Sequence, residues 1–235
     1  MQRITEVDAL RGFALLLMIA YHFFFDLWFL GVAEINIWNI EWLLFQRTVG
    51  TLFILVAGIS MTLSESRNQE GYARHAKRGL KLIVVALLIT LATWVYPHEG
   101  FIMFGIIHFL AIAAFLGPLF FRFGKWNVLL GLLIIAAGFF INAIRTDLAY
   151  FFWLGVVYEG YRPLDHYSLV PWFGLILIGI YLGQRLFPEG KQLLRHYPKY
   201  TEKLAFLGKH SLLIYLVHQP VIVGLILLAL SLAGG

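Results

Sequence analysis

Long apolar runs with few polar interruptions dominate the chain. Seven of them approach the roughly 20 residues that cross a bilayer as a helix. They predict spanning helices at 9–30, 42–63, 80–96, 101–121, 127–144, 169–186 and 210–232. The runs are continuously apolar rather than alternating, which excludes a transmembrane β-barrel. The pattern therefore predicts an all-α polytopic bundle of about seven spans, with residues 1–235 forming a single domain.

Composition agrees with a membrane protein, because 60% of the residues are hydrophobic and only 13% are charged. The first run contains histidine and aspartate and lacks a small-x-small cleavage site, so we expect a retained helix rather than a signal peptide. The chain has no cysteine, which excludes disulfides and a thiol nucleophile. The net charge of +5 is modest and gives no indication of nucleic-acid binding.

Basic residues predict the orientation, because cytoplasmic loops of membrane proteins are enriched in Lys and Arg. An N-terminus in the cytoplasm puts 14 of the 18 basic residues on the inner side. These are Arg3, Arg67, Arg74, Lys77, Arg78, Lys81, Arg122, Lys125, Arg185, Lys191, Arg195, Lys199, Lys203 and Lys209. The carboxylates on the outer side are Glu34, Glu41, Glu99, Asp147, Glu159 and Asp165. We expect this topology in the cytoplasmic membrane of a prokaryote.

Two connections are long enough to have structure of their own. The outer connection 145–168 contains an aromatic piece at 149–159, which is too short to span and is predicted to be interfacial or re-entrant. The inner segment 187–209 has the composition of a polar loop, with a short surface helix expected at 191–196.

The first predicted helix carries a polar stripe. At 100° per residue, Asp8, Arg11, His22 and Asp26 fall within one narrow sector of an otherwise apolar helix. Ionisable groups at membrane depth are costly, so they are candidates for a functional site. The alternative is that Asp8 and Arg11 mark the cytoplasmic end, while His22 and Asp26 form an i, i+4 packing pair.

Other spans place ionisable groups at a similar depth. Counted from the outer ends, His22, Asp26, Arg47 and His108 lie roughly 12, 6, 7 and 10 Å below the boundary. If their faces converge, they line a polar cavity that opens to the outside and makes general acid–base chemistry available. His218 lies nearer the middle of the last span and is assigned a structural role. The histidines lack the spacing of metal ligands, so we expect no metal.

A basic helical face precedes the third span. Arg74, Lys77, Arg78 and Lys81 stand at i, i+3, i+4 and i+7. Four cations at a helix N-terminus oppose the macrodipole, and a bound anion would relieve them. Membrane lipids can supply that anion, and the positive-inside bias alone would also place these charges here.

Four segments together resemble a known family. The first contains Arg11, ten residues and then His22 (RGFALLLMIAYH), which is similar to the Arg-x(10)-His signature of membrane O-acyltransferases. The fuller resemblance is to the family of the heparan-α-glucosaminide N-acetyltransferase catalytic domain, and it covers nearly the whole chain. It includes VDALRGFALLLMIAYH, FGIIHF at 104–109, LDHYSLVPWFGLILIG at 164–179 and LGKHSLLIYLVHQPV at 207–221.

The resemblance implies transfer of an acetyl group from cytosolic acetyl-CoA to a sugar amine or hydroxyl across the membrane. His22 would be the acid–base residue, oriented by Asp26. Arg11 and the basic face Arg74, Lys77, Arg78 and Lys81 would meet CoA, and His108 and Asp165 would line the acceptor side. Arg47 or His108 would stabilise the oxyanion. A homodimer is compatible with this expectation.

One departure from the family leaves alternatives open. In the branch of the lysosomal enzyme we expect asparagine at the position of His22 and a histidine in the following loop, yet residues 27–41 contain none. Either His22 has taken over the role or the chain is not an equivalent enzyme. A proton-coupled permease with His22, Asp26 and His108 as a relay is the rival, although no inverted repeat is visible. A non-catalytic scaffold would leave the polar layer unexplained.

Overall fold

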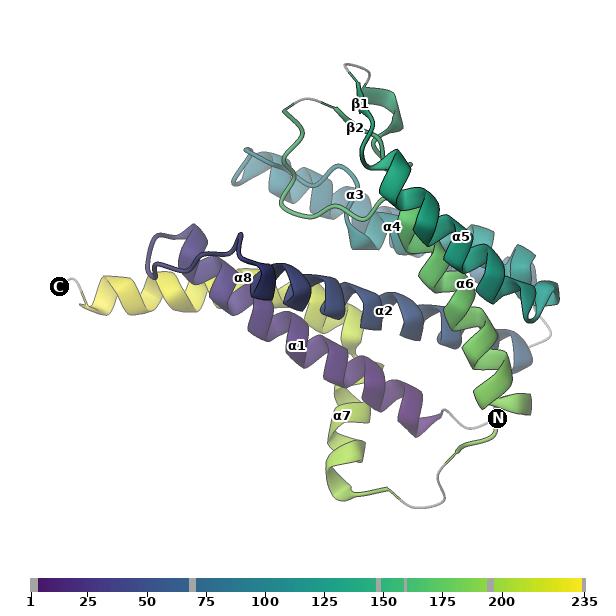
Figure 1. The fold of residues 1–235 in the computed structure, drawn as a ribbon. Coiled ribbons are helices and arrows are strands. Elements are labelled where there is room, and N and C mark those ends of the chain that lie inside the picture. Colours follow the sequence, from purple (N-terminus) through teal and green to yellow (C-terminus); the bar gives the residue numbers. More distant parts are fainter. Residues whose placement is uncertain (1–3, 68–70, 147–148, 159, 194–196, 234–235) are drawn as a thin grey trace. The chain divides into compact units, whose positions relative to one another are not determined.

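The structure of the chain, a computed structural model, describes residues 4–67, 71–146, 149–158, 160–193 and 197–233. It divides into two compact units (Figure 1), one formed by residues 54–191 and the other by residues 2–53 and 192–235. The helices, in chain order, are α1 (Thr5–Phe29), α2 (Ile40–Arg67), α3 (Tyr72–Val95), α4 (Ile106–Leu116), α5 (Trp126–Ile141), α6 (Leu169–Leu186), α7 (Lys199–Lys209) and α8 (Ser211–Ala233).

The all-α polytopic architecture is confirmed, but the number of spans is corrected. Within the described residues six helices are long and apolar enough to cross a membrane, rather than seven. The difference is α5, whose 16 residues extend about 24 Å, less than the roughly 30 Å hydrocarbon core. The predicted span 127–144 is too long because the helix ends at Ile141 and turns: Ala143 N–H donates to Phe140 O and Ile144 N–H to Ile141 O.

One side of α3 has the exposed apolar surface that is typical of a helix in contact with lipid. Leu80, Val84, Leu87, Leu88 and Leu91 are each more than half exposed. They recur at intervals of three and four residues and therefore form one continuous apolar stripe. Water would not tolerate such a stripe over this length, whereas a bilayer would. The chain is an integral, multi-pass membrane protein.

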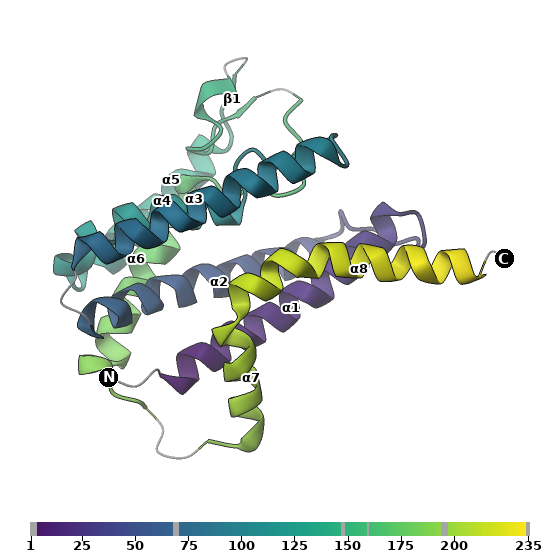
Figure 2. The same cartoon turned by 180° about the vertical axis from the view of Figure 1, so that it is seen from behind.

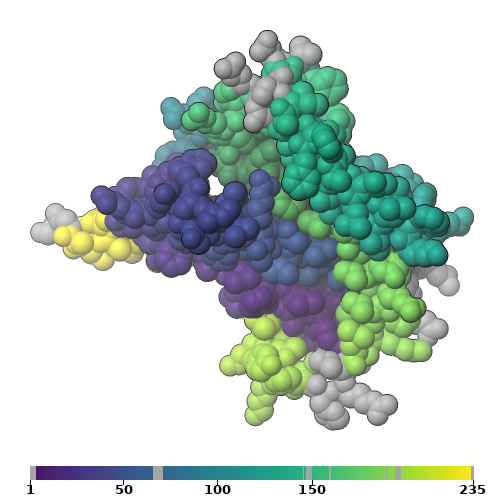
Figure 3. Space-filling model, in the orientation of Figure 1, coloured from purple at the N-terminus to yellow at the C-terminus, as the bar shows by residue number. Residues whose placement is uncertain are grey.

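Glycines bring α5 and α6 into close contact. Figure 3 shows the atoms of these two helices touching on one face. A Cβ on Gly131 would overlap the carbonyl oxygen of Gly174, and a Cβ on Gly138 would lie 2.7 Å from Pro171 Cβ. The later residue of α5 thus contacts the earlier residue of α6, so the two helices are antiparallel. Although α5 is short, it therefore returns the chain to the end of the unit where α4 begins.

The connection between α5 and α6 lies beside the start of α4. Leu164 N–H donates to Gly100 O (2.7 Å), and Tyr167 N–H donates to Phe104 O (3.1 Å). The aromatic piece predicted at 149–159 contains η2 (Ala149–Phe151) and β2 (Val157–Tyr158), which pairs in parallel with β1 (Arg145–Thr146). Its interfacial position stays a prediction, and residue 159 lies outside the described residues.

The other unit contains α1, the first half of α2, α7 and α8. Gly12 of α1 and Gly208 of α7 allow backbone contact, because a Cβ on Gly208 would overlap the carbonyl oxygen of Asp8. Leu15 and Met18 are buried against residues of α2, α7 and α8. Figures 1 and 2 show α1 and α8 running in the same direction, so their starts lie at the same end of this unit.

The polar loop predicted at 187–209 is wrong for its second half, which is the helix α7. Ala205 and Gly208 are buried, whereas Lys199, Lys203 and Phe206 are exposed. This burial pattern has the helical period, and the short polar helix is stabilised by packing on α1. The surface helix predicted at 191–196 is not seen at 191–193, and residues 194–196 lie outside the described part, as do Arg3 and Asp147.

Candidate functional site

Two contacts between α1 and α8 bring polar side chains together inside one unit. The ring centroids of His22 and His218 lie 4.8 Å apart, with the ring planes at 70°. One helical turn further along α1, Asp26 Oδ1 accepts a hydrogen bond from Gln219 Nε2 (3.1 Å). Adjacent residues of α8 thus contact two residues of the polar stripe that the sequence predicts on α1.

The hydrogen bonds of both histidines define their neutral tautomer. His22 Nδ1 lies 2.9 Å from Met18 O, and His218 Nδ1 contacts Tyr215 O. A carbonyl oxygen only accepts, so Nδ1 carries the hydrogen in each ring and Nε2 carries the lone pair. Each imidazole therefore presents a basic nitrogen away from its own helix.

The Met18 carbonyl makes the hydrogen bond to His22 that the sequence analysis expects from Asp26. His22 bonds the Met18 carbonyl, and Asp26 bonds Gln219. The backbone of α1 therefore fixes the His22 tautomer, as a carbonyl bonded to the far ring nitrogen does in many metal and catalytic sites. An orienting role for Asp26 through direct contact stays a prediction.

The residues of this cluster differ in how far they are buried. His22 is partly exposed, whereas Asp26 and His218 retain only 2% and 7% of their exposed area. Three buried atoms have no hydrogen-bond partner among the described residues: Asp26 Oδ2, His218 Nε2 and Gln219 Oε1. Each such atom costs about 1–3 kcal/mol relative to a satisfied one. Structures retain this cost where a group has chemistry to perform.

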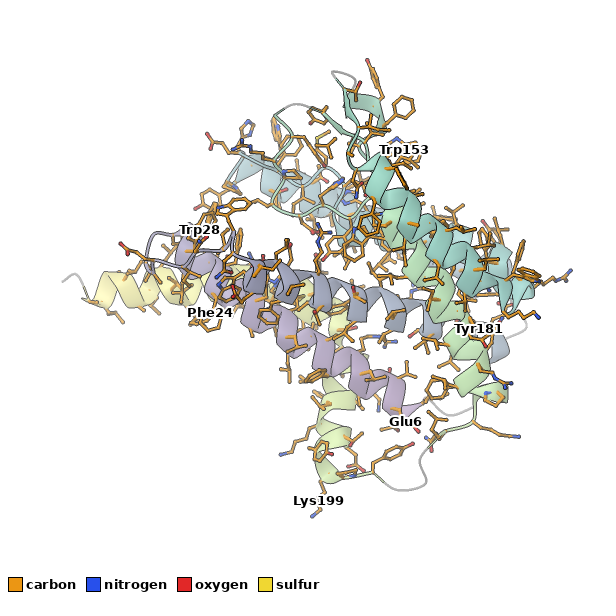
Figure 4. All side chains as sticks on the ribbon, in the orientation of Figure 1. Glu6, Phe24, Trp28, Trp153, Tyr181 and Lys199 are labelled. Atoms are coloured by element: carbon orange, nitrogen blue, oxygen red, sulfur yellow. The ribbon has the colours of Figure 1, made fainter. Side chains whose placement is uncertain are left out.

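Figure 4 labels three residues of α1 that help to follow this helix. Glu6 marks the start of the helix, and Phe24 and Trp28 mark its far end, on either side of Asp26 in the sequence. His22 lies about 16 Å along the axis from Arg11. The two halves of the predicted stripe are therefore separate sites on one helix.

Arg11 lies where α1 meets α7. Its Nη1 donates to Asp8 Oδ1 (2.9 Å) and to Gly208 O (3.3 Å). The second bond satisfies a carbonyl in the last turn of α7, where a cation also suits the helix dipole. Arg47 lies in the same unit on α2 with an exposed side chain. Contacts of Arg11 with CoA and of Arg47 with substrate stay predictions.

His108 lies at the N-terminus of α4 in the other unit. Its Nδ1 accepts the Gly105 N–H (3.3 Å), so the hydrogen of the neutral ring is on Nε2. Nε2 donates to Thr90 Oγ1 (3.1 Å), and the Thr90 hydroxyl donates to Ile102 O (2.7 Å). Both ring nitrogens are therefore engaged, and His108 holds the start of α4 against α3.

Asp165 closes the same helix end. Its Oδ2 accepts the Ile106 N–H (2.9 Å), and a side chain at Gly105 would overlap that oxygen. Burial raises the pKa of the Asp165 carboxyl to about 6, and the Ile106 and His166 N–H groups oppose this shift. Burial also raises the pKa of the Tyr161 hydroxyl, which lies 3.1 Å from His166 Nδ1.

Replacing Asp165 tests this cap through its pH dependence. The folded-state pKa of about 6 exceeds the ordinary 3.8, so folded protein binds more protons between these values and stability at this group falls as pH rises. We expect Asp165→Asn, whose amide oxygen still accepts the Ile106 N–H, to raise the apparent melting temperature in detergent at neutral pH. The gain should vanish towards about pH 4.

The matched variant Asp165→Ala also removes the titrating carboxyl, and in addition it removes the acceptor for the Ile106 N–H, so it should be about 1 kcal/mol less stable than Asp165→Asn at every pH. A gain from Asp165→Asn that stays constant with pH would contradict the raised pKa.

The basic face predicted before the third span lies in the first turns of α3. Lys77, Arg78 and Lys81 are exposed, and Arg74 is partly exposed. Beneath this face His75 is 2% exposed and its Nε2 lies 3.1 Å from Glu65 Oε2 of α2. The helix and the spacing are as predicted, and the ligand stays a prediction.

The structure thus brings together only part of the predicted site. His22, Asp26 and Arg47 belong to one unit, and His108, Asp165 and the basic face belong to the other. Convergence of His22 and His108 on one cavity stays a prediction. In the described residues no group of three or more His, Cys, Asp or Glu is arranged to hold a metal.

Two residues of the cluster escape the sequence reasoning. His218 is assigned there only a structural role, and Gln219 is not singled out. The signal that would identify them is the polar pair His218–Gln219 directly before Pro220, inside the apolar run of α8. Proline within a helix removes a backbone donor and perturbs the preceding turn, which is often where functional groups are placed.

The helices and the cluster between α1 and α8 define a multi-pass membrane protein with basic histidine nitrogens inside its helical bundle. The model of the family "Heparan-alpha-glucosaminide N-acetyltransferase, catalytic" matches residues 3–220. The chain belongs to this family of transmembrane acetyltransferases, as the sequence resemblance indicates. Neither a curated protein nor a solved structure matches it.

Proposed function

We propose that this protein transfers an acetyl group from cytosolic acetyl-CoA to the amine or hydroxyl of a sugar on the outer side of the cytoplasmic membrane of a prokaryote. Family membership supports acetyl transfer. The observation that carries the mechanism is the tautomer of His22. Its Nδ1 is bonded to Met18 O, so Nε2 of this partly exposed residue carries the lone pair that a general base needs.

In the proposed reaction His22 Nε2 accepts a proton from the acceptor as it attacks the thioester carbonyl. The same nitrogen then protonates the departing sulfur, so one residue acts as base and as acid. Asp26, one turn away and bonded to Gln219, contributes negative charge beside the imidazolium that forms. Arg47 is the candidate for oxyanion stabilisation in the same unit.

Sidedness follows from charge and from helix direction. Basic residues gather around the starts of α1, α3 and α8, which supports a cytoplasmic position for these helix ends. α1 and α8 run in the same direction, in agreement with one side for both starts. His22 lies about 20 Å along α1 from the inner boundary near Ala9. The pantetheine arm of acetyl-CoA therefore enters the bundle, and the nucleotide stays near the inner surface.

Vesicles with the two substrates on chosen sides test this proposal. With acetyl-CoA trapped inside and glucosamine outside, reconstituted protein should form N-acetylglucosamine. With both substrates only outside intact vesicles, product should fall to background, and detergent should restore it. Mixed orientations do not matter, because either orientation needs substrates on opposite sides. Equal rates with both substrates outside would reject the sidedness, and no product in detergent would reject the activity.

The inner basic face is proposed to bind the phosphates of CoA. Replacing Arg78 and Lys81 with Gln should weaken acetyl-CoA binding about tenfold at low salt, and the difference should shrink as salt screens the charges. Binding is measured by titration of the detergent-solubilised protein.

The matched control for the basic face is Lys199→Gln with Lys203→Gln, which removes two exposed charges from α7. This control should keep the parent affinity. Unchanged acetyl-CoA affinity in a correctly inserted Arg78/Lys81 variant would assign the face to lipid head groups instead.

A further inference from the structure

Building on the proposed function, we propose that His218 holds the first proton released by an ammonium acceptor, so that His22 is free to act as base a second time. His218 does not touch the reacting atoms in this arrangement. It is a positioning residue that acts through His22. The inference concerns only the unit formed by α1, the first half of α2, α7 and α8.

Proton balance makes a second acceptor site useful. A hydroxyl and a thioester give an ester and a thiol with no proton left over. A sugar amine at neutral pH arrives as an ammonium, and its transfer gives an amide, a thiol and one free proton. The ammonium must lose one proton before its nitrogen has a lone pair for attack, and another when the amide forms. A single base serves both steps only if it is discharged between them.

The steps are balanced as follows. His22 Nε2 takes a proton from the ammonium and passes it to His218 Nε2, which restores the neutral base. The amine lone pair then forms the C–N bond while the C=O pair moves to oxygen, and His22 takes the second proton. Collapse of the intermediate breaks the C–S bond, and His22 returns that proton to sulfur. The proton on His218 leaves through His22 before the next cycle.

The geometry of the two rings fits this role. They lie 4.8 Å apart between centroids, and each carries its lone pair on Nε2 because its Nδ1 is bonded to a carbonyl of its own helix. His22 is partly exposed, whereas His218 is 7% exposed. The exposed ring can meet substrate, and the buried ring lies behind it.

The unpartnered atoms of the cluster between α1 and α8 are complementary to one added proton. Without it, His218 Nε2, Asp26 Oδ2 and Gln219 Oε1 are three buried acceptors with no donor among the described residues. A proton on His218 Nε2 converts one of the three acceptors into a donor. The Asp26 carboxylate, on the next turn of α1 from His22, also offsets the positive charge of the imidazolium.

The groups that face His218 can be named for each packed element. α1 contributes His22, whose ring contacts that of His218, and Asp26, which bonds the next residue, Gln219. α8 itself contributes Tyr215, whose ring lies 5.4 Å from that of His218. α7 and α2 contribute Leu207 and Val49 to the adjoining core. Asp26 supplies the negative charge in this set.

The test is the pH dependence of glucosamine acetylation by His218→Asn in detergent. The Asn amide can still donate to Tyr215 O in place of Nδ1, but it cannot take up a proton. In mildly acidic buffer, where glucosamine is an ammonium, we expect kcat/KM to fall about 10²-fold relative to the parent. In alkaline buffer, where the amine arrives neutral, the two proteins should differ by less than about threefold.

His210→Asn is the matched control, because His210 Nδ1 also bonds a carbonyl of its own helix, Phe206 O, at 2.9 Å, but the ring is exposed. It should follow the parent at every pH. His218→Gln, whose amide reaches the Nε2 position, is the second variant and should behave like His218→Asn.

A merely structural role predicts an equal loss at all pH values together with a lower melting temperature, and either an equal loss or no loss overturns the proposal. Failure of the proposed function is a different result, namely no acetylation by the parent protein.

Discussion

Replacing His22 with Ala should abolish acetyl transfer while leaving acetyl-CoA binding nearly unchanged. General acid–base catalysis by one side chain contributes about 10²–10⁴-fold, so we expect a loss of that size in kcat. Binding should persist because His22 lies about 20 Å along α1 from the inner boundary where the nucleotide is proposed to rest. Turnover with glucosamine and equilibrium binding of acetyl-CoA are measured on the same purified protein.

His98→Ala is the control for this loss, because His98 is exposed and its Nδ1 also bonds a helix carbonyl, Trp94 O, at 2.7 Å. It should keep the parent rate. Asp26→Asn should slow transfer less than His22→Ala, since the amide removes only the charge that favours the imidazolium. A stable His22→Ala protein that still transfers acetyl at the parent rate would reject His22 as the base.

Replacing Gly208 with Ala should destabilise the protein by about 3 kcal/mol, which is at the upper end of the cost of overpacking. The added Cβ would overlap the carbonyl oxygen of Asp8 and come within 3.0 Å of Gly12 N, and a backbone cannot yield as a flexible side chain does. Separation of α1 and α7 also weakens the bond from Arg11 to Gly208 O. The apparent melting temperature in detergent measures the effect.

Gly224→Ala provides the opposite control within the same unit. Gly224 is inside α8, and a Cβ there meets nothing within 4 Å. Alanine is the better helix former by about 1 kcal/mol, so this variant should be equally or more stable than the parent. Equal effects of the two substitutions would show that α1 and α7 do not pack through glycine backbones.

The sequence identifies the helices well because membrane depth imposes a long apolar run on each of them. α1 begins at Thr5 and ends at Phe29, close to the predicted 9–30, and α6 matches its predicted end at 186. The errors of the sequence-based prediction have local causes. The turn after Ile141 shortens α5, and α7 is missed because a polar helix is recognised only through the face it buries.

The candidate site is only partly accessible to the same reasoning. Helical periodicity places His22 and Asp26 on one face, but it does not say which helix covers that face. The partners are His218 and Gln219, almost 200 positions away in the chain. Helical periodicity also does not predict which hydrogen bonds a side chain makes. His108 is predicted to line a polar cavity, yet both of its ring nitrogens are engaged in hydrogen bonds at the start of α4.

The pairing of the first helix with the last has a consequence for biosynthesis. Residues 2–53 and 192–235 build one compact unit, so α1 is made long before its partners α7 and α8. Until α8 follows, Asp26 lacks the amide of Gln219 and His22 lacks its neighbouring ring. A chain interrupted before α7 therefore carries His22 and Asp26 without the side chains that contact them from α8. The cluster is complete only when the last helix has been made, and acetyl transfer that depends on it would begin at that point.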